Sequence, residues 1–368
     1  MQLYTFYTES TLKLHYHMVN TLPYRVCRDP INRNLLMKGL QYCPLYDYLW
    51  HAFMAVNCID LYYQKETCGI DDVLNLSKDA YLNMGDYHMT RSMLSLAEEV
   101  KKQEDAKKAV SLVLTTMLHI FYATGSPNQM IADRAYFGLG KNLGLLFTEY
   151  AVMFSKCTIF NQACARYCIN EWSEDAINYF PEFLYGLIDV EYEDTNEPNE
   201  PNNKQKVKPL SNDCKIMLKT MVDRLKREFR SFANPTIYRN PIMSSRYVPI
   251  DSLLNKDDDL SNDDGLNNNV KKLEYDMYGT MSRYIVEIPD LFIEMQEMND
   301  PRALLITAYN VISLVSRRYE YWPISVYRRE LDYIKSLLTK LENENLWIRW
   351  MDVAYNVLDG LENETTSH

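Results

Sequence analysis

Cysteine and histidine are the first candidates for functional residues in this sequence, because both bind metals and both can act as nucleophiles or bases. The eight cysteines contain no Cys-x-x-Cys pair. Cys164 and Cys168 share one face of an expected helix, and Cys157 lies close before them, but a structural zinc site needs about four ligands and no second half is visible. The histidines include no His-x-x-x-His pair, and His15 and His17 point apart on a helix. The sequence therefore predicts reduced, mostly buried thiols, no metal site and no cofactor.

The segment "GLGKNLG", from Gly138 to Gly144, has the glycines and the lysine of a phosphate-binding loop. Such loops need a preceding β-strand and a defined glycine spacing, and both are missing here. The expected role is therefore helix packing. The sequence also shows no serine elbow and no pair of carboxylates in apolar surroundings, so catalysis is not expected.

Aromatic residues gather towards the C-terminus, where "NLWIRWMDV" carries two of the five tryptophans. Aromatic stripes usually belong to the core, but such residues also line pockets for apolar ligands. There the polar atoms of Tyr and Trp can form a hydrogen bond with a hydroxyl group of the ligand. The candidate ligand pocket consists of Tyr309, Ile312, Trp347 and Trp350. Ordinary core packing remains the alternative.

The totals describe a folded, acidic chain. It has 368 residues, 47% of them apolar, and 39 Lys and Arg against 50 Asp and Glu, for a net charge of −11. This charge disfavours binding to nucleic acids and to anionic membrane surfaces. The opening "MQLYTFYTES" is unlike a secretory leader. The longest stretch without charges, 109–132, contains a histidine, a proline and several hydroxyl groups, so it indicates a buried helix and no transmembrane segment.

Sparse glycine and proline and repeated helical periodicity predict an all-α fold. Asp300 followed by Pro301 marks a helix start, with the aspartate as N-cap. One further helix is expected from the apolar stripe Leu45, Leu49, Phe53, Val56 and Ile59. Separate helices are expected over 76–102, 109–123, 132–154, 160–172, 181–187 and 212–232. Three C-terminal helices carry the stripes Leu304, Ala308, Val311, Val315; Leu331, Ile334, Leu338, Leu341; and Trp347, Trp350, Ala354, Val357, Leu361.

Two polar segments interrupt the helices, "DVEYEDTNEPNEPNNKQ" and "NKDDDLSNDDGLNNN". Their composition is typical of surface loops. We therefore expect a single irregular helical bundle with two long polar loops. It divides into an N-terminal helical part (1–188), an acidic flexible loop (189–211), a helix with a proline-rich irregular segment (212–254), a polar loop (255–270) and C-terminal helices on the same core (271–362).

Several segments, read in order, resemble the regulatory, non-DNA-binding region of fungal zinc-cluster transcription factors, closest to the sterol-uptake regulators. The segments are "LYTFYTEST", "CPLYDYLWHAFMAVNCIDLYY", "YLNMGDYHMTRSML" and, at the end, "PRALLITAYNVIS" and "LWIRWMDVAYNVL". The residues that match the family pattern are Pro44, Leu45, His51, Ala52, Ala55, Tyr81, His88, Leu94, Ala303, Leu304, Tyr309, Val311, Trp347 and Trp350.

The resemblance implies an all-helical domain that holds an apolar ligand, typically a sterol, and controls an attached DNA-binding module. Two departures stand out. The six-cysteine zinc cluster is missing, so the chain is expected to be a fragment or a relative that has lost its DNA-binding domain. Arg349 also replaces the glycine of the family's closing Trp-x-x-Gly-Trp pattern.

The leading expectation is thus a regulatory module of a fungal transcription factor, nuclear or cytoplasmic, that senses a sterol-like ligand near the candidate pocket. Binding would favour one of two conformations. Possible partners are a second copy of the chain or transcription co-regulators, with no direct contact to nucleic acid. The alternative is a ligand-free helical scaffold for protein–protein interaction or dimerisation.

Overall fold

The computed structural model describes residues 9–26, 30–67, 74, 76–100, 106–130, 134–155, 182–189, 207–232, 288–316, 322–341 and 344–366. Within these ranges the chain forms 13 helices and no strand, which confirms the predicted all-α class. The expected helix over 160–172 and most of the two polar loops lie outside the described residues.

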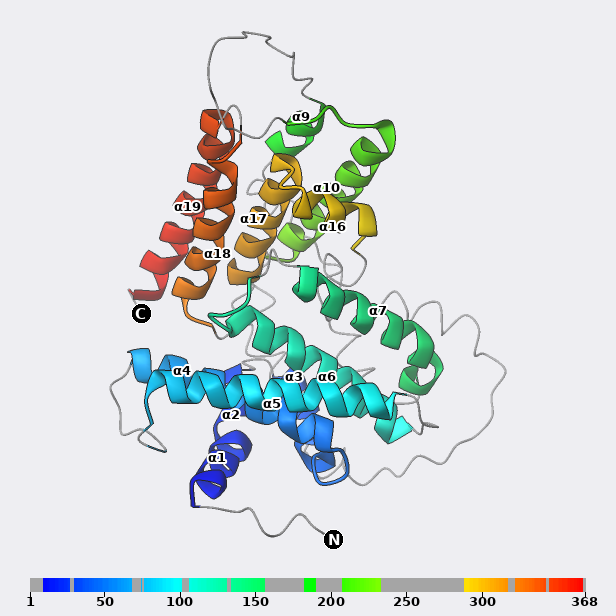
Figure 1. The fold of residues 1–368 in the computed structure, drawn as a ribbon, viewed down its shortest axis with the longest axis vertical. Coiled ribbons are helices and arrows are strands. Elements are labelled where there is room, and N and C mark those ends of the chain that lie inside the picture. Colours follow the sequence, from blue (N-terminus) through cyan, green and yellow to red (C-terminus); the bar gives the residue numbers. More distant parts are fainter. Residues whose placement is uncertain are drawn as a thin grey trace, which may run out of the picture.

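The helices form two groups, one below the other in Figure 1. The lower group contains α1 (Glu9–Asn20), α2 (Leu22–Val26), α3 (Pro30–Tyr42), α4 (Asp47–Thr67), α5 (Lys78–Glu99), α6 (Ala106–Gly125) and α7 (Arg134–Ser155). The upper group contains α9 (Phe183–Asp189), α10 (Asn212–Phe232), α16 (Asp290–Glu297), α17 (Pro301–Ser316), α18 (Ile324–Leu338) and α19 (Glu344–Thr366).

In the lower group, α4 is the central helix and packs against α5, α6 and α1. The predicted stripe is buried at Leu49, Phe53, Val56 and Ile59. Leu45 is 64% exposed, against the prediction, because it lies in the turn before α4 begins. Most of the charge-free segment lies in α6, and nearly every side chain from 108 to 126 is buried, as expected of an inner helix.

A buried charge attaches the first helices to α4. The Asp60 side chain is fully buried, and the Arg25 Nε donates to both of its oxygens at 3.1 Å. Gln64 donates to the same carboxylate at 2.6 Å, and the His17 Nδ1–H donates to Asn57 Oδ1 at 2.6 Å. A buried carboxylate is stable only with such partners, so this network fixes where α1 and α2 dock.

In the upper group, α17 is the central helix. It contacts α9, α10, α16, α18 and α19, and every residue from 301 to 314 is buried. The predicted start is confirmed, since α17 begins at Pro301 and Asp300 Oδ1 accepts from the Arg302 backbone N–H at 3.0 Å. The stripe of α18 is also confirmed, with Leu331, Ile334, Leu338 and Leu341 all buried.

The stripe of α19 is only partly as predicted. Trp347 and Ala354 are fully buried, but Val357 is 40% exposed, and Met351 and Leu358 are buried in its stead. The inward face therefore runs through residues 347, 351, 354 and 358. As a consequence, Trp350 lies at the border of this face and is half-buried.

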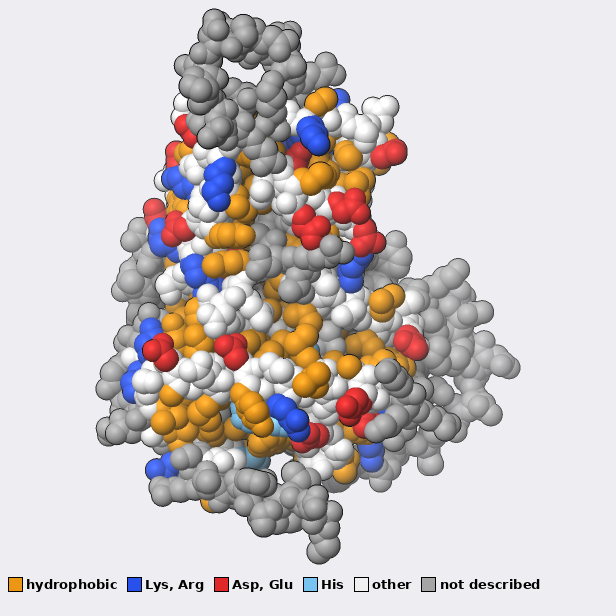
Figure 2. Space-filling model, viewed as in Figure 1, with side chains coloured by type: hydrophobic (Ala, Val, Ile, Leu, Met, Phe, Trp, Pro, Cys, Tyr) orange, Lys and Arg blue, Asp and Glu red, His pale blue; other side chains and the backbone are white. Residues whose placement is uncertain are grey.

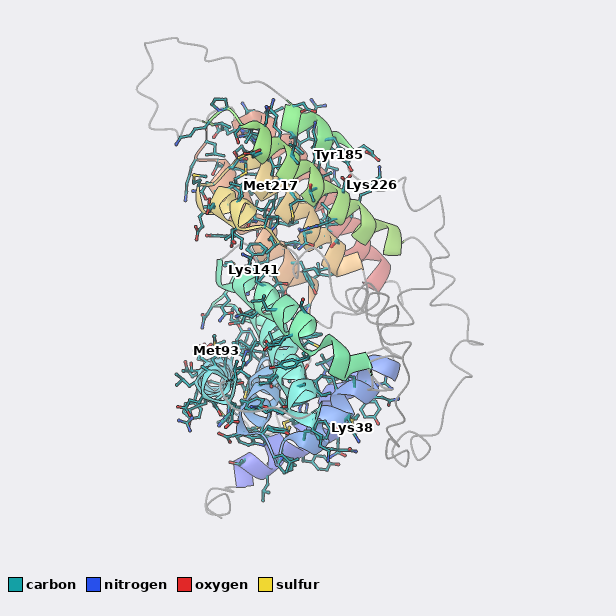
Figure 3. The ribbon with its side chains drawn as sticks, turned by 90° about the vertical axis from the view of Figure 1, so that its right-hand side faces the viewer. Lys38, Met93, Lys141, Tyr185, Met217 and Lys226 are labelled. Carbon is teal, nitrogen blue, oxygen red and sulfur yellow. The ribbon has the colours of Figure 1, made fainter. Side chains whose placement is uncertain are left out.

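The two groups meet through a few side chains. The Trp322 indole packs against Gly125 and lies 5.7 Å from the Tyr63 ring. Lys141 of α7, labelled in Figure 3, forms an ion pair with Asp290 at the start of α16. The buried apolar residues of both groups belong to one continuous core.

Candidate functional site

The candidate pocket residues lie on α17 and α19, which pack against each other. Tyr309, Ile312 and Trp347 are 2%, 1% and 0% exposed, and Trp350 is half-buried. The first three therefore belong to the interior of the upper group, and Trp350 is the member closest to solvent.

Two of the four residues are joined directly. The Tyr309 hydroxyl donates to the Trp350 backbone carbonyl oxygen at 2.8 Å. Burial raises the pKa of this phenol well above its usual value of 10, so the hydroxyl remains a donor at any physiological pH. This bond fixes α19 against α17 at the level of Trp350.

A third aromatic side chain, Phe183 of α9, completes the cluster. Its ring lies flat on the Trp350 indole, with the ring centroids 3.7 Å apart and an interplanar angle of 11°. The same ring meets Tyr309 edge-on, at 5.4 Å and 72°. The sequence predicted a helix around Phe183, but nothing local indicated this contact, because its partners lie more than a hundred residues further along the chain.

The Trp350 indole has one further unusual property. Its Nε1–H is shielded from solvent and finds no hydrogen-bond acceptor among the residues that the structure describes. The guanidinium of the exposed Arg349 lies 5.7 Å from the centroid of the same indole. Trp350 thus combines a flat stacking surface, an unused donor and a nearby positive charge.

A second cluster, formed by His51 and His88, was missed by the sequence analysis, which found no His-x-x-x-His pair. They face each other across the α4–α5 contact, with the two Nδ1 atoms 2.7 Å apart, so one nitrogen donates its hydrogen to the other. Trp50 packs edge-on against both imidazoles, at 4.8 and 5.4 Å. The carboxylate of Asp47 lies 3.7 Å from His51 Nε2. Figure 2 shows histidine surface between hydrophobic side chains on the front face near α5.

Burial disfavours the charged form of both imidazoles. It lowers the pKa of His88 to about 4, with the charge of His51 acting in the same direction. The pKa of His51 is also lowered, chiefly by burial and further by Arg91, although Asp47 opposes the shift. Both rings are therefore neutral at pH 7, and the pair shares its hydrogen without carrying charge.

A serine–histidine pair also occurs, at Ser92 and His119, with Oγ 2.7 Å from Nε2. The Ser92 hydroxyl already donates to the Tyr48 backbone oxygen at 2.7 Å. His119 must then donate to the serine, and it cannot accept the serine proton as a catalytic base must. Both side chains are buried, and burial lowers the pKa of His119 to about 3. The pair is a structural link between α5 and α6.

The remaining sequence candidates are placed as follows. The segment "GLGKNLG" lies inside α7, so its backbone amides are held in helical hydrogen bonds and do not form a phosphate loop. Cys43 and Cys58 are buried, and burial raises the pKa of each thiol to about 12. Cys157, Cys164 and Cys168 lie outside the described residues. Among the residues described, no three His, Cys, Asp or Glu side chains are grouped to hold a metal ion.

Of the helices that the structure describes, none combines the length and the apolar character needed to cross a membrane. A comparison with models of known protein families, a search of curated proteins and a search of solved structures each found no match to this chain.

Proposed function

We propose that this chain is the regulatory module of a fungal transcription factor and that it senses an apolar, sterol-like ligand in order to control transcription. The observation that carries the proposal is the contact between His51 and His88. These two histidines belong to separate segments of the family resemblance and lie 37 residues apart in the sequence. Their direct contact supports the view that the resemblance reflects shared packing and goes beyond a general apolar pattern.

The sensing step is supported by the aromatic cluster on α17 and α19. Tyr309 and Trp350, both part of the resemblance, are joined by a hydrogen bond from the Tyr309 hydroxyl to the Trp350 backbone, and the Phe183 ring of α9 stacks on the indole. A ligand that displaces this ring would favour one position of the Phe183 side chain over another. Binding would then shift the population between a silent and an active form.

The experiment uses the full chain. The purified protein is extracted for bound lipids, and its melting temperature is measured with cholesterol and, as a control, with oleate. We expect a rise in melting temperature with the sterol and a smaller one with the fatty acid, because a ligand that binds only the folded state stabilises it. If no lipid is extracted and the melting temperature does not change when the sterol is added, the sensing function is refuted.

A ligand-free scaffold for protein–protein contacts is the second candidate, and the tight burial of Tyr309, Ile312 and Trp347 favours it. Trp350→Ala separates the two functions. In a scaffold the variant should lose most of the roughly 3–5 kcal/mol that removing a fully buried aromatic ring costs, because Trp350 is half-buried and stacks on Phe183. In a ligand module it should lose less stability and most of the sterol-induced shift.

A further inference from the structure

Two departures from ordinary packing meet at Trp350. Aromatic pairs prefer edge-on or offset contacts with centroids about 4.5–7 Å apart. The Phe183 and Trp350 rings instead overlap almost completely, at 3.7 Å and 11°. The indole N–H beside this stack is buried without a described acceptor, whereas buried tryptophans usually find one. The Phe183 ring therefore covers a face of the Trp350 indole but provides no acceptor for its N–H.

The helix that supplies Phe183 is held in place by its other residues. The Tyr185 hydroxyl donates to Asp223 of α10 at 2.5 Å, and Lys219 of α10 forms an ion pair with Asp189 at 2.9 Å. Lys226 of α10 lies over the Tyr185 ring, as the labelled side chains in Figure 3 show. The side chains of Leu184, Leu187 and Ile188 are buried in the core.

Phe183 is the first residue of α9, and its ring is only half-buried. It can therefore rotate away from Trp350 while the contacts of Tyr185 and Asp189 keep α9 on α10. The displaced ring would expose the indole face that it now covers. The edge that carries the unused Nε1–H borders this face, and the nearby Arg349 is already exposed.

We propose that Phe183 occupies the place of a ligand, and that this ligand is an aromatic carboxylic acid whose carboxylate is carried on a short flexible arm. The aromatic ring would stack on Trp350 as Phe183 does now. The arm would let the carboxylate drop to the edge of the indole, accept from Nε1–H and lie near Arg349. A charge-assisted hydrogen bond of this kind is stronger than a neutral one, which gives the acid an advantage over the phenylalanine ring. This inference goes beyond the proposed sterol sensing, because it assigns a second class of ligand, an aromatic acid, to the same aromatic cluster.

The test measures binding of 1-naphthaleneacetate by calorimetry, with 1-naphthaleneethanol as the neutral probe of the same shape. Phe183→Ala should bind the acid at least tenfold more tightly than the unchanged chain, because the competing ring is gone. Leu184→Ala removes a buried side chain from the same helix and keeps the Phe183 ring, so its affinity should equal that of the unchanged chain. Equal affinities in these two variants would overturn the proposal.

Two further substitutions examine the polar contacts. In the Phe183→Ala background, Trp350→Phe keeps a ring for stacking but removes the N–H, and Arg349→Gln removes the charge. Arg349→Gln should weaken binding of the acid several-fold and leave the alcohol nearly unchanged. Trp350→Phe should weaken binding of the acid more than that of the alcohol, because the alcohol oxygen accepts only a neutral hydrogen bond from the N–H. If acid and alcohol weaken equally, the carboxylate contact is refuted. Should Phe183→Ala fail to fold by circular dichroism, Phe183→Leu replaces the flat ring by an aliphatic side chain that stacks less well on the indole, and it is expected to show a smaller gain in the same direction.

The outcomes also separate this inference from the proposed function. A chain that binds the sterol but shows no effect of Phe183→Ala refutes the aromatic acid and leaves sterol sensing intact. If sterols do not bind but Phe183→Ala binds the acid more tightly, sterol sensing is refuted and the proposed binding of an aromatic acid on Trp350 is supported.

Discussion

The neutral His51–His88 pair predicts that this protein loses stability in mildly acidic solution. In the unfolded chain His88 regains its ordinary pKa of 6.5, whereas in the folded protein burial and the neighbouring His51 lower its pKa to about 4. Between these values the unfolded state binds the proton and the folded state does not. Stability is therefore fully present above the unfolded pKa and falls as the pH drops from 6.5 towards 4.

The size of the effect follows from the shift. One pKa unit corresponds to about 1.4 kcal/mol, so the complete loss due to His88 is roughly 3 kcal/mol. Between pH 7 and pH 5 linkage gives a loss of about 2 kcal/mol. The charged groups that face the pair are Asp47 and Arg91, which act on His51 in opposite directions.

The assay is urea unfolding at pH 7 and pH 5, for the unchanged chain and for His88→Leu. Other groups also titrate, so the decisive quantity is the difference between the two pH dependences. We expect the variant to be less stable at pH 7, because His51 loses its partner, but to lose about 2 kcal/mol less between the two pH values. His15→Leu, on the half-exposed face of α1, serves as control and should keep the original pH dependence. A His88→Leu variant with that same original dependence would refute the reasoning.

Three further predictions follow from packing and burial. Gly125→Ala should cost about 1–3 kcal/mol in thermal unfolding, because the new Cβ would lie 2.6 Å from the Trp322 indole. Asp60→Ala should cost roughly 3–5 kcal/mol in urea unfolding, since it leaves the Arg25 side chain without its buried carboxylate. Cys58 should resist alkylation by iodoacetamide at pH 7.5, as judged by peptide mass spectrometry, because it is fully buried and its pKa is raised to about 12.

Each of these has a matched control in the chain. Gly138 has nothing within 4 Å of an added Cβ, so Gly138→Ala should be neutral or stabilise α7 by about 0.5–1 kcal/mol, and equal effects at both glycines would contradict the packing argument. Lys335→Ala breaks an exposed ion pair with Asp352 and should cost less than about 1 kcal/mol. The half-buried Cys214 should be alkylated readily, and a similar rate at Cys58 would disprove its protection.

Much of the local structure could be predicted from the sequence. The helix α10 has the bounds that were expected, and the start of α17 follows from Asp300 and Pro301. These features depend on residues within one or two helical turns, so the periodicity and the capping residues are sufficient to predict them.

The orientation of α19 could not be decided in this way. Spacings of three and four residues fit both the stripe through Trp350 and Val357 and the stripe through Met351 and Leu358. Successive side chains on a helix point about 100° apart. The two stripes, which diverge at 350 and 351 and again at 357 and 358, therefore lie on different faces of α19. Only the packing of α17 and α18 against α19 selects the second stripe and leaves Val357 40% exposed.

The sequence by itself determined that this chain is helical, where most of its described helices lie and many of the apolar residues that enter its core, because these properties follow from composition and short-range periodicity. The tertiary structure alone decided that His51 meets His88, and that Phe183 covers Trp350. Both contacts join residues on different helices, and no local pattern specifies how two amphipathic surfaces are rotated against each other when they pack. The chemistry argued for this protein depends on those two contacts.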